Sequence, residues 1–262
     1  MILLSGATGR LGTLLTKRLV NRGLEVRALT RDPARAQHLN ADLVTVVRGD
    51  VRDPASLALA ADGVDVVVSA MHGFSEPARG SLARVDRDGN TNLTDAAKSA
   101  GADFVLISTV GASADSPLEL FRFKHAAEQQ AIRSGVPTTI VRATAFLELW
   151  IELLRQTGGR SGRPLVFGRG QNPINFVSVA DVAALVERVV IDPTTRGKVL
   201  GIGGPENLTF DQLADAVQGA AGRTKTPPAR AADDVAHDGQ HDRPRQAPAG
   251  PSGAGRTGDG PR

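Results

Sequence analysis

The sequence opens with MILLSGATGRLG (residues 1–12), a hydrophobic run that leads directly into three glycines at the spacing GxxGxxG. Gly6 permits a tight turn off a strand, Gly9 leaves room for a pyrophosphate beside the backbone, and Gly12 lets the following helix pack close to the sheet. The N-terminus of that helix offers free N–H groups and a partial positive charge to phosphates. Because a strand pattern precedes the glycines and a helix pattern follows them, the stretch predicts a dinucleotide-binding loop.

Length and composition limit the class of protein. The 262 residues suffice for one large α/β domain with a small appended lobe. There is no cysteine, which excludes disulfides, thiolate metal sites and cysteine nucleophiles, and we expect no bound metal. The net charge of +3 is too small to argue for nucleic acid, and no apolar run has the length of a membrane span. With no signal peptide visible at the start, we expect a cytoplasmic protein without nucleic-acid or membrane partners.

Short β-branched runs alternate with helical patterns along most of the chain. The predicted strands are 1–5, 25–30, 42–48, 64–70, 104–108, 138–142 and 199–202. The predicted helices are 11–22, one that begins near 53, 86–100, 118–134, 181–190 and 210–221. This alternation is typical of βαβ units. It predicts an α/β fold, a Rossmann-type doubly wound parallel sheet with a small, incomplete C-terminal lobe.

The predicted domain organisation separates the body of the chain from its last forty residues. Residues 1–222 are expected to form the NAD(P)-binding domain, in which a small substrate lobe is built mainly from 145–180 and 203–222. Residues 223–262 contain six Pro and six Gly, with Val235 as the one large aliphatic residue. Such a segment cannot bury enough apolar surface to offset its chain entropy, so we expect it to be a disordered tail. The abrupt change suggests a lost or altered C-terminus.

The end of the second strand indicates the type of cofactor. NAD-specific sites usually place an acidic residue there to bind the ribose 2′-hydroxyl. Here Arg31 holds that position, where a guanidinium could bind a 2′-phosphate, and Asp32 belongs to the turn before Pro33. We therefore expect NADP(H) to be preferred over NAD(H), with Arg10 of the glycine loop as a second phosphate contact. The alternative is that Arg31 is a solvated residue at a strand end.

Two further strand ends carry candidate cofactor contacts. After the third strand, Asp50 could accept a hydrogen bond from the adenine amino group while Val51 packs on the ring. Alternatively, Asp50 caps the following turn. The fourth strand ends in Ser69-Ala70-Met71, small residues and a methionine at the edge where a nicotinamide ribose would lie.

Several motifs in the chain occur together in one known family. In order they are GATGRLG, TRDP, GDV, DGNTNLTDAAKSAG, FVLIST and SGVPTTIVRATAF. In order and spacing they resemble the NmrA-like, atypical branch of the short-chain dehydrogenase/reductase superfamily over about residues 1–215. The resemblance implies an NADPH-dependent oxidoreductase that transfers hydride to a small quinone or carbonyl substrate. The alternative is a non-catalytic NADP(H)-sensing regulator that acts through a protein partner.

The resemblance also implies a catalytic set, from which this chain departs. Ser108 and Thr109 follow the fifth strand, and Lys124 lies on the next helix, where the family lysine holds the nicotinamide ribose. Many members carry a Tyr four residues before that Lys, but Leu120 stands there and the chain has no Tyr at all. Quinone reductases of this branch commonly lack the Tyr as well. A quinone needs little acid catalysis, so water could deliver the proton with electrostatic support from Lys124.

The C-terminal lobe supplies the remaining expectations. Phe146 and Trp150 could wall an apolar substrate pocket, although such residues are often plain core. Asp181 is expected to be a helix N-cap. The residues expected to bind the cofactor are Gly6, Ala7, Thr8, Gly9, Arg10, Leu11, Gly12, Arg31, Asp50, Val51, Ser69, Ala70, Met71 and Lys124.

Overall fold

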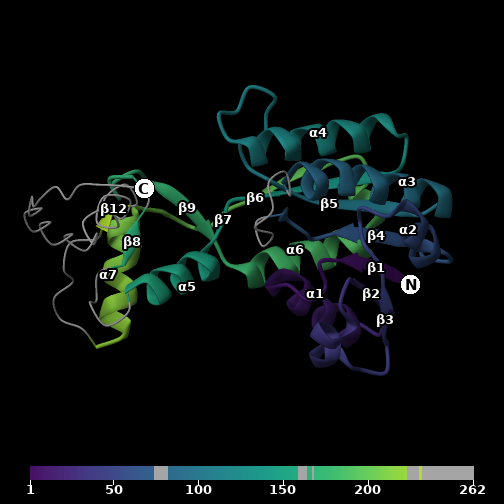
Figure 1. The fold of residues 1–262 in the computed structure, drawn as a ribbon, viewed down its shortest axis with the longest axis horizontal. Helices are drawn as coiled ribbons and strands as arrows, with labels where there is room; N and C mark the ends of the chain where they lie inside the picture. Colours follow the sequence, from purple (N-terminus) through teal and green to yellow (C-terminus); the bar gives the residue numbers. More distant parts are fainter. Residues whose placement is uncertain (74–81, 159–163, 167, 223–229, 232–262) are drawn as a thin grey trace, which may run out of the picture.

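A seven-stranded parallel sheet with helices on both faces forms the larger part of the molecule (Figure 1). The computed structural model describes residues 1–73, 82–158, 164–166, 168–222 and 230–231. The strand order is β10-β6-β5-β4-β1-β2-β3. The strands are β1 (Ile2–Ser5), β2 (Val26–Thr30), β3 (Val44–Arg48), β4 (Val66–Ser69), β5 (Asp103–Thr109), β6 (Thr138–Ala143) and β10 (Val199–Ile202). The predicted Rossmann-type α/β fold is confirmed.

Alternating side chains of the central strands supply two separate cores. Ile2 and Leu4 of β1 pack toward one face of the sheet, and Leu3 packs toward the other. The first face is covered by α1 (Arg10–Asn21) and α6 (Val179–Ile191). The second is covered by α2 (Pro54–Ala61), α3 (Asn90–Ala100) and α4 (Glu119–Arg133). Each fully buried Leu or Ile contributes about 1.5–3 kcal/mol, so the continuous apolar runs of β1 and β4 fix these strands at the centre.

Short helical segments connect several of these elements. A 3₁₀ segment, η1 (Pro33–Leu39), follows β2, and a second, η4 (Pro193–Thr195), follows α6. The predicted helix over 86–100 begins earlier, as a π-helical turn, η3 (Ala83–Gly89), that continues into α3. Segment η1 was not predicted as a helix, although the Asp32 side chain accepts a hydrogen bond from Ala34 N and so caps it.

The start of α6 corrects one prediction. Asp181 is not its N-cap but lies in the first turn, and Ser178 is the capping residue. The Ser178 hydroxyl accepts from Ala180 N at 3.1 Å, and Glu148 accepts from Val179 N. The helix therefore begins almost one turn before the position that the acidic residue suggested.

A small lobe lies beside the carboxyl ends of β6 and β10 (Figure 1). Its three-stranded sheet has the order β11-β9-β7 and packs with two helices. These elements are β7 (Ala145–Phe146), α5 (Leu147–Gly158), β9 (Ile174–Val177), β11 (Asn207–Leu208) and α7 (Phe210–Ala220). Helix α5 was not expected from the sequence. Within the predicted tail, β12 (Arg230–Ala231) pairs with β8 (Leu165–Val166). The other residues of 223–262 lie outside the described residues.

A buried carboxylate joins the two helices on the first face. Glu187 of α6 is 4% exposed and accepts from Arg18 Nε at 2.5 Å and Arg22 Nε at 2.7 Å, both on α1. Burial alone would raise the pKa of Glu187, but the hydrogen bonds from Arg22 and Arg18 outweigh it and hold the pKa below its usual value.

Glu187→Gln should therefore lower the free energy of unfolding by about 1.5–3 kcal/mol at neutral pH, the usual value for hydrogen bonds to a charged group. Because the pKa is lower in the folded state, this contribution is present above the unfolded value of 4.5 and is lost as the pH falls through the folded value. Urea unfolding of both proteins over a range of pH checks it. A difference that stays constant below pH 4.5 would contradict this account.

Candidate functional site

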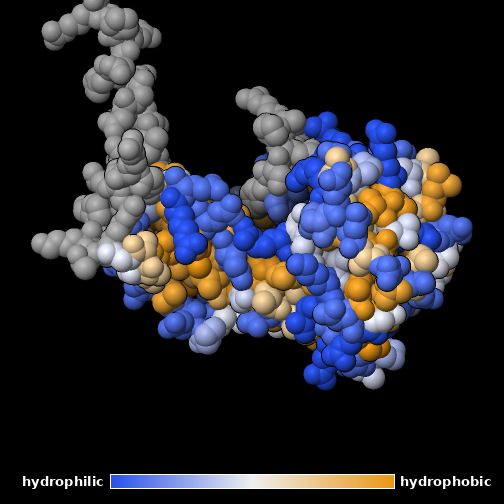
Figure 2. All heavy atoms as spheres, turned by 90° about the horizontal axis from the view of Figure 1, so that it is seen from below, coloured by the Kyte–Doolittle hydropathy of each residue, from blue (hydrophilic) through white to orange (hydrophobic). Residues whose placement is uncertain are grey.

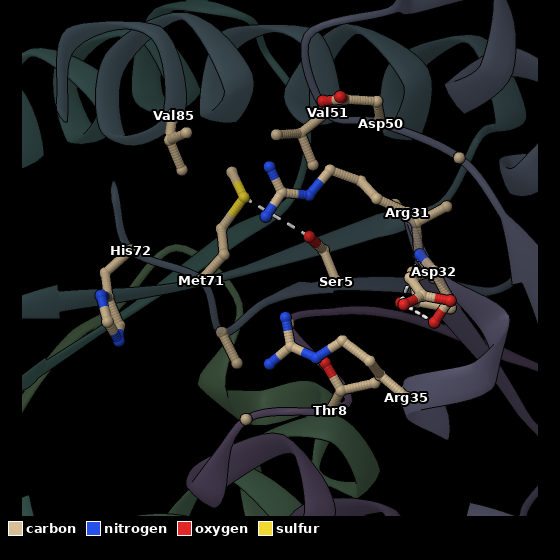
Figure 3. A pocket seen from close by; sticks show the side chains of 16 residues that line it. Ser5, Thr8, Arg31, Asp32, Arg35, Asp50, Val51, Met71, His72 and Val85 are labelled. Atoms are coloured by element: carbon tan, nitrogen blue, oxygen red, sulfur yellow. Dashed lines mark hydrogen bonds between the residues drawn. The ribbon is translucent and has the colours of Figure 1, made fainter. Parts of the chain in front are cut away.

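A pocket of about 480 Å³ opens at the carboxyl ends of β1, β2, β3 and β4 (Figure 3). Strand order reverses here, because β1 lies between β2 and β4, and ligands of open α/β sheets bind at such a switch point. The pocket is lined by Ser5, Gly6, Thr8, Gly9, Leu29, Thr30, Arg31, Asp32, Arg35, Gly49, Asp50, Val51, Ala70, Met71, His72 and Val85. The predicted cofactor residues among them therefore come together in one cavity.

The glycine loop is shaped by close backbone approaches. Gly6 has φ +82°, and a Cβ there would lie 2.4 Å from the Ala70 carbonyl oxygen. A Cβ on Gly12 would lie 2.2 Å from the Gly6 carbonyl oxygen. Gly9 N donates to the Gly6 carbonyl at 3.0 Å, which closes the turn. Side chains at Gly6 and Gly12 are excluded by backbone atoms, as a loop that admits a pyrophosphate requires.

The N-terminus of α1 is free to bind an anion. Gly9 is its N-cap, no side chain caps it, and its first turn has no acidic residue. Thr8 lines the pocket, whereas Ala7 and Leu11 are buried in the core on the first face of the sheet. These two residues therefore anchor the loop in the core, and the uncapped N–H groups at the start of α1 are of the kind that bind anions.

Arg10 does not line the pocket. Its guanidinium forms an exposed ion pair with Glu152 of α5, so it bridges the glycine loop and the small lobe. The expected phosphate contact of Arg10 stays a prediction, and it would require this ion pair to open.

Two arginines reach into the pocket from the β2 end. Arg31 follows β2, and Arg35 comes from η1; in Figure 3 both side chains extend into the cavity on either side of Ser5. No acidic side chain among the described residues forms an ion pair with Arg35. Asp32 also lines the pocket, but its carboxylate caps η1. Sequence reasoning missed Arg35 because it did not predict η1, the segment that turns this residue back toward Arg31.

Asp50 lines the pocket, but its carboxylate has local partners. It accepts from Arg52 Nε at 2.9 Å and from Arg52 backbone N at 2.9 Å. The side-chain hydrogen bond from Arg52 is the main cause that lowers the pKa of Asp50. The turn-capping role that the sequence left open is thus present, and a contact to adenine stays a prediction. Val51 lines the same part of the pocket.

The end of β4 forms the opposite wall. Ala70 and Met71 line the pocket, and the Ser5 hydroxyl donates to Met71 Sδ at 3.4 Å. Ser69 is fully buried instead, and its hydroxyl donates to Asn90 Oδ1 at 2.6 Å. It supports the wall from behind rather than facing the cavity.

His72 also lines this end and was not anticipated from the sequence. Its side chain is exposed, but desolvation by the surrounding protein and the positive charge of Lys124 lower its pKa, against the opposing charge of Asp86.

Lys124 lies behind this wall. It is only 6% exposed, and its ammonium donates to the Met71 carbonyl at 3.1 Å and the Ile107 carbonyl at 3.2 Å. Asp86 Oδ1 lies 3.0 Å from the same nitrogen. Ser108 and Thr109 end β5 nearby, but neither they nor Lys124 line the described pocket. The Ser108 hydroxyl is buried and has no hydrogen-bond partner within the described part of the chain.

The predicted substrate residues belong to the lobe. The Trp150 ring of α5 contacts Phe210 edge-on at a centroid distance of 4.9 Å, and Phe146 packs against the core beneath α1 and α6. Neither lines the described pocket. Hydrophobic side chains gather over the lobe and at its junction with the sheet in Figure 2, and Leu149 of α5 is 50% exposed. A substrate role for Phe146 and Trp150 stays a prediction.

Comparison with known proteins agrees with this geometry. A family model described as NAD(P)H-binding matches residues 6–193. The chain belongs to this NAD(P)H-binding family. The pyrophosphate loop, both pocket arginines and Lys124 all fall within the matched residues.

Relatives and solved structures give the enzyme class. The chain is 30% identical over 227 residues to the NAD(P)H azoreductase of Xenophilus azovorans, and this alignment covers 85% of the chain and 74% of the relative. It is 29% identical over 228 residues to quinone oxidoreductase 2 of Escherichia coli (86% and 76% covered). A crystal structure of an NADPH-dependent quinone oxidoreductase from E. coli with NADPH superposes with a TM-score of 0.74 at 28% identity (91% and 81% covered). The expected class, an NAD(P)H-dependent oxidoreductase of the quinone-reductase-like, NmrA-like branch, is confirmed.

In the described part of the chain, no helix is both long and apolar enough to cross a membrane. Among the same residues, no cluster of three or more His, Cys, Asp or Glu side chains could hold a metal ion. Location in the cytoplasm stays a prediction.

Proposed function

We propose that this protein binds NADPH in preference to NADH and uses it to reduce a small quinone. The observation that carries the proposal is the pocket at the β1 switch point, where an uncapped helix N-terminus and two arginines meet. The family to which the chain belongs supports the cofactor class, and the relatives named as quinone oxidoreductases support the acceptor.

The residues of the pocket fit the parts of NADPH in order. The N-terminus of α1 would hold the pyrophosphate, because its N–H groups are uncapped and the glycines leave space beside the backbone. Val51 would pack on the adenine, and Arg31 and Arg35 would bind the 2′-phosphate. A guanidinium matches the geometry of a phosphate better than an ammonium does, which favours this assignment.

The class of hydride acceptor is inferred from the proton donors that the site offers. The chain has no Tyr, and desolvation together with the charge of Lys124 lowers the pKa of His72, which disfavours its protonated form. When bound, NADPH would supply a hydride, and the hydroquinone anion formed from a quinone would be stable enough to take its proton from water. An acceptor with a basic oxyanion, such as a simple ketone, would need a stronger acid at that point. The site therefore favours quinones over unactivated carbonyls.

Turnover of NADPH with a panel of quinones and ketones tests the proposal. We expect NADPH oxidation with quinones at rates above the uncatalysed reaction and little with simple ketones. Titration of NADPH and NADP⁺ in the same preparation separates the alternative, an NADP(H)-sensing regulator. Tight binding that depends on oxidation state, without turnover of any quinone, would contradict the enzyme and favour the sensor.

A further inference from the structure

Asp86 and Lys124 form a buried ion pair that none of the functional assignments above explains. Asp86 lies in the π-helical turn η3 and is fully buried; Lys124 lies in α4 and is 6% exposed. Their side-chain atoms Oδ1 and Nζ are 3.0 Å apart. Taking two charges out of water is costly unless their remaining hydrogen-bonding capacity is also satisfied. The partners that satisfy it therefore show what the pair does.

Those partners are backbone groups at the ends of β4 and β5. The Lys124 ammonium donates to the Met71 and Ile107 carbonyls, and it forms an ion pair with Asp86 Oδ1, which has no hydrogen-bond partner among the described residues. Asp86 Oδ2 accepts from Gly73 N at 2.8 Å. Backbone carbonyls thus take two of the three donors of Lys124, and the ammonium also lies against the Asp86 carboxylate.

The pair consequently holds the backbone on both sides of His72. The carbonyl before His72 accepts from Lys124, and the amide after it donates to Asp86. Asn90 fixes the turn η3 in the same assembly, because its Nδ2 donates to the Asp86 carbonyl at 2.7 Å. A π-helical turn of this kind is frequent at functional sites.

The held turn is a wall of the cofactor pocket. Met71 and His72 both line it, on the side of β4, and in Figure 3 they lie across the cavity from Asp50 and Asp32. In this fold the adenosine half of a dinucleotide lies at the β2 side of the switch point, and the nicotinamide half lies toward β4 and β5.

We propose that Asp86 and Lys124 act together as positioning residues, which fix Met71 and His72 against the nicotinamide end of the site. The inference rests on the proposed function for its turnover readout. The pair lies away from the pyrophosphate loop and from Arg31 and Arg35. Loss of the pair therefore lowers the rate of hydride transfer and leaves the affinity for NADPH nearly unchanged.

Asp86→Asn tests this directly. A carboxylate can accept from both Lys124 and Gly73, but a carboxamide has one oxygen, so one of the two partners must face an N–H group. We expect kcat with a quinone to fall by about 10–100-fold, the order of loss that a displacement of about 1 Å produces. The dissociation constant of NADPH should change by less than about twofold, well below the tenfold change that corresponds to about 1.4 kcal/mol.

Hydrogen exchange supplies a readout that needs no turnover. The Gly73 amide donates to Asp86, so a peptide ending at Gly73 should exchange faster in Asp86→Asn than in the wild type, with or without NADPH. If the wild type proves to be a sensor without turnover, the proposed function fails but this exchange measurement still decides whether the pair holds the turn.

Glu128→Gln is the matched control. Glu128 is buried, lies one turn after Lys124 on α4, and pairs with Arg142 of β6 at 2.5 Å. This variant should lower thermal stability while kcat and exchange at Gly73 stay at wild-type values. Unchanged exchange at Gly73 in Asp86→Asn, or an equal loss of kcat in Glu128→Gln, would overturn the proposal.

A double variant covers the case in which Asp86→Asn does not fold. Asp86→Asn with Lys124→Gln removes both buried charges and leaves none uncompensated, so it should be more stable than either single variant. The double variant should still show fast exchange at Gly73 and a reduced kcat. Recovery of wild-type kcat in it would contradict a positioning role.

Discussion

Gly12→Ala should abolish tight binding of NADPH, with a dissociation constant at least about 100-fold above that of the wild type, or roughly 2.7 kcal/mol of lost binding free energy. An added Cβ would lie 2.2 Å from the Gly6 carbonyl oxygen and 2.6 Å from Ala7 Cα. Both are backbone atoms, so the glycine loop must move away from α1 to admit it. The displaced loop no longer presents the N–H groups of α1 to the pyrophosphate. Fluorescence titration with NADPH measures the effect.

Gly23→Ala is the control for Gly12→Ala. Gly23 ends α1 with φ +73°, and no atom lies within 4 Å of a Cβ added there. Its left-handed backbone costs an alanine about 1–2 kcal/mol, comparable to the roughly 1–3 kcal/mol of overpacking at Gly12. The two variants should therefore lose similar stability, and only Gly12→Ala should lose NADPH. Equal NADPH affinity in the two variants would contradict the assignment of the loop.

Replacing both pocket arginines should remove the preference for NADPH. In Arg31→Ala with Arg35→Ala, the ratio of dissociation constants for NADH and NADPH should fall by about 100-fold or more, since a hydrogen bond to a charged group contributes about 1.5–3 kcal/mol. NADH affinity should stay nearly constant, because NADH has no 2′-phosphate for the arginines to bind. Calorimetric titration of both cofactors measures the two constants.

Arg52→Ala controls for loss of positive charge near the pocket. Arg52 binds the Asp50 carboxylate and does not line the pocket, so its removal should change NADPH and NADH affinity by the same factor. The wild-type preference should also weaken as salt is added, because partly exposed charges are screened. If Arg31→Ala with Arg35→Ala kept the wild-type preference for NADPH over NADH, the 2′-phosphate would bind elsewhere.

The parts of the fold with strong periodicity could be predicted from the sequence. The runs Ile2–Ser5 and Val66–Ser69 are largely apolar and buried on both faces, as a central parallel strand requires, and the glycine spacing located the helix after β1. Helix α5 and segment η1 were missed. Helix α5 follows β7 without a turn residue, and η1 is short and polar, so neither offers the boundary or the pattern that such predictions need.

The site residues that directly follow parallel strands could be predicted from the sequence. Contacts between residues far apart in the sequence could not. Arg31, Val51 and Met71 follow parallel strands, so topology alone brings them to one pocket. The pairing of Asp86 with Lys124 depends on a π-helical turn that shifts the register of a helix, which no periodicity in the sequence shows. Lys124 was expected to reach the ribose, and its three internal partners are visible only in three dimensions.

Single-turnover mixing of the wild-type protein saturated with NADPH against excess quinone, without oxygen, tests the central claim most directly. The nicotinamide absorbance of one equivalent per protein chain should disappear at least about 100-fold faster than that of free NADPH with the same quinone, a barrier lowered by roughly 2.7 kcal/mol. Bound NADPH that is oxidised no faster than free NADPH would contradict the proposal that this protein reduces quinones.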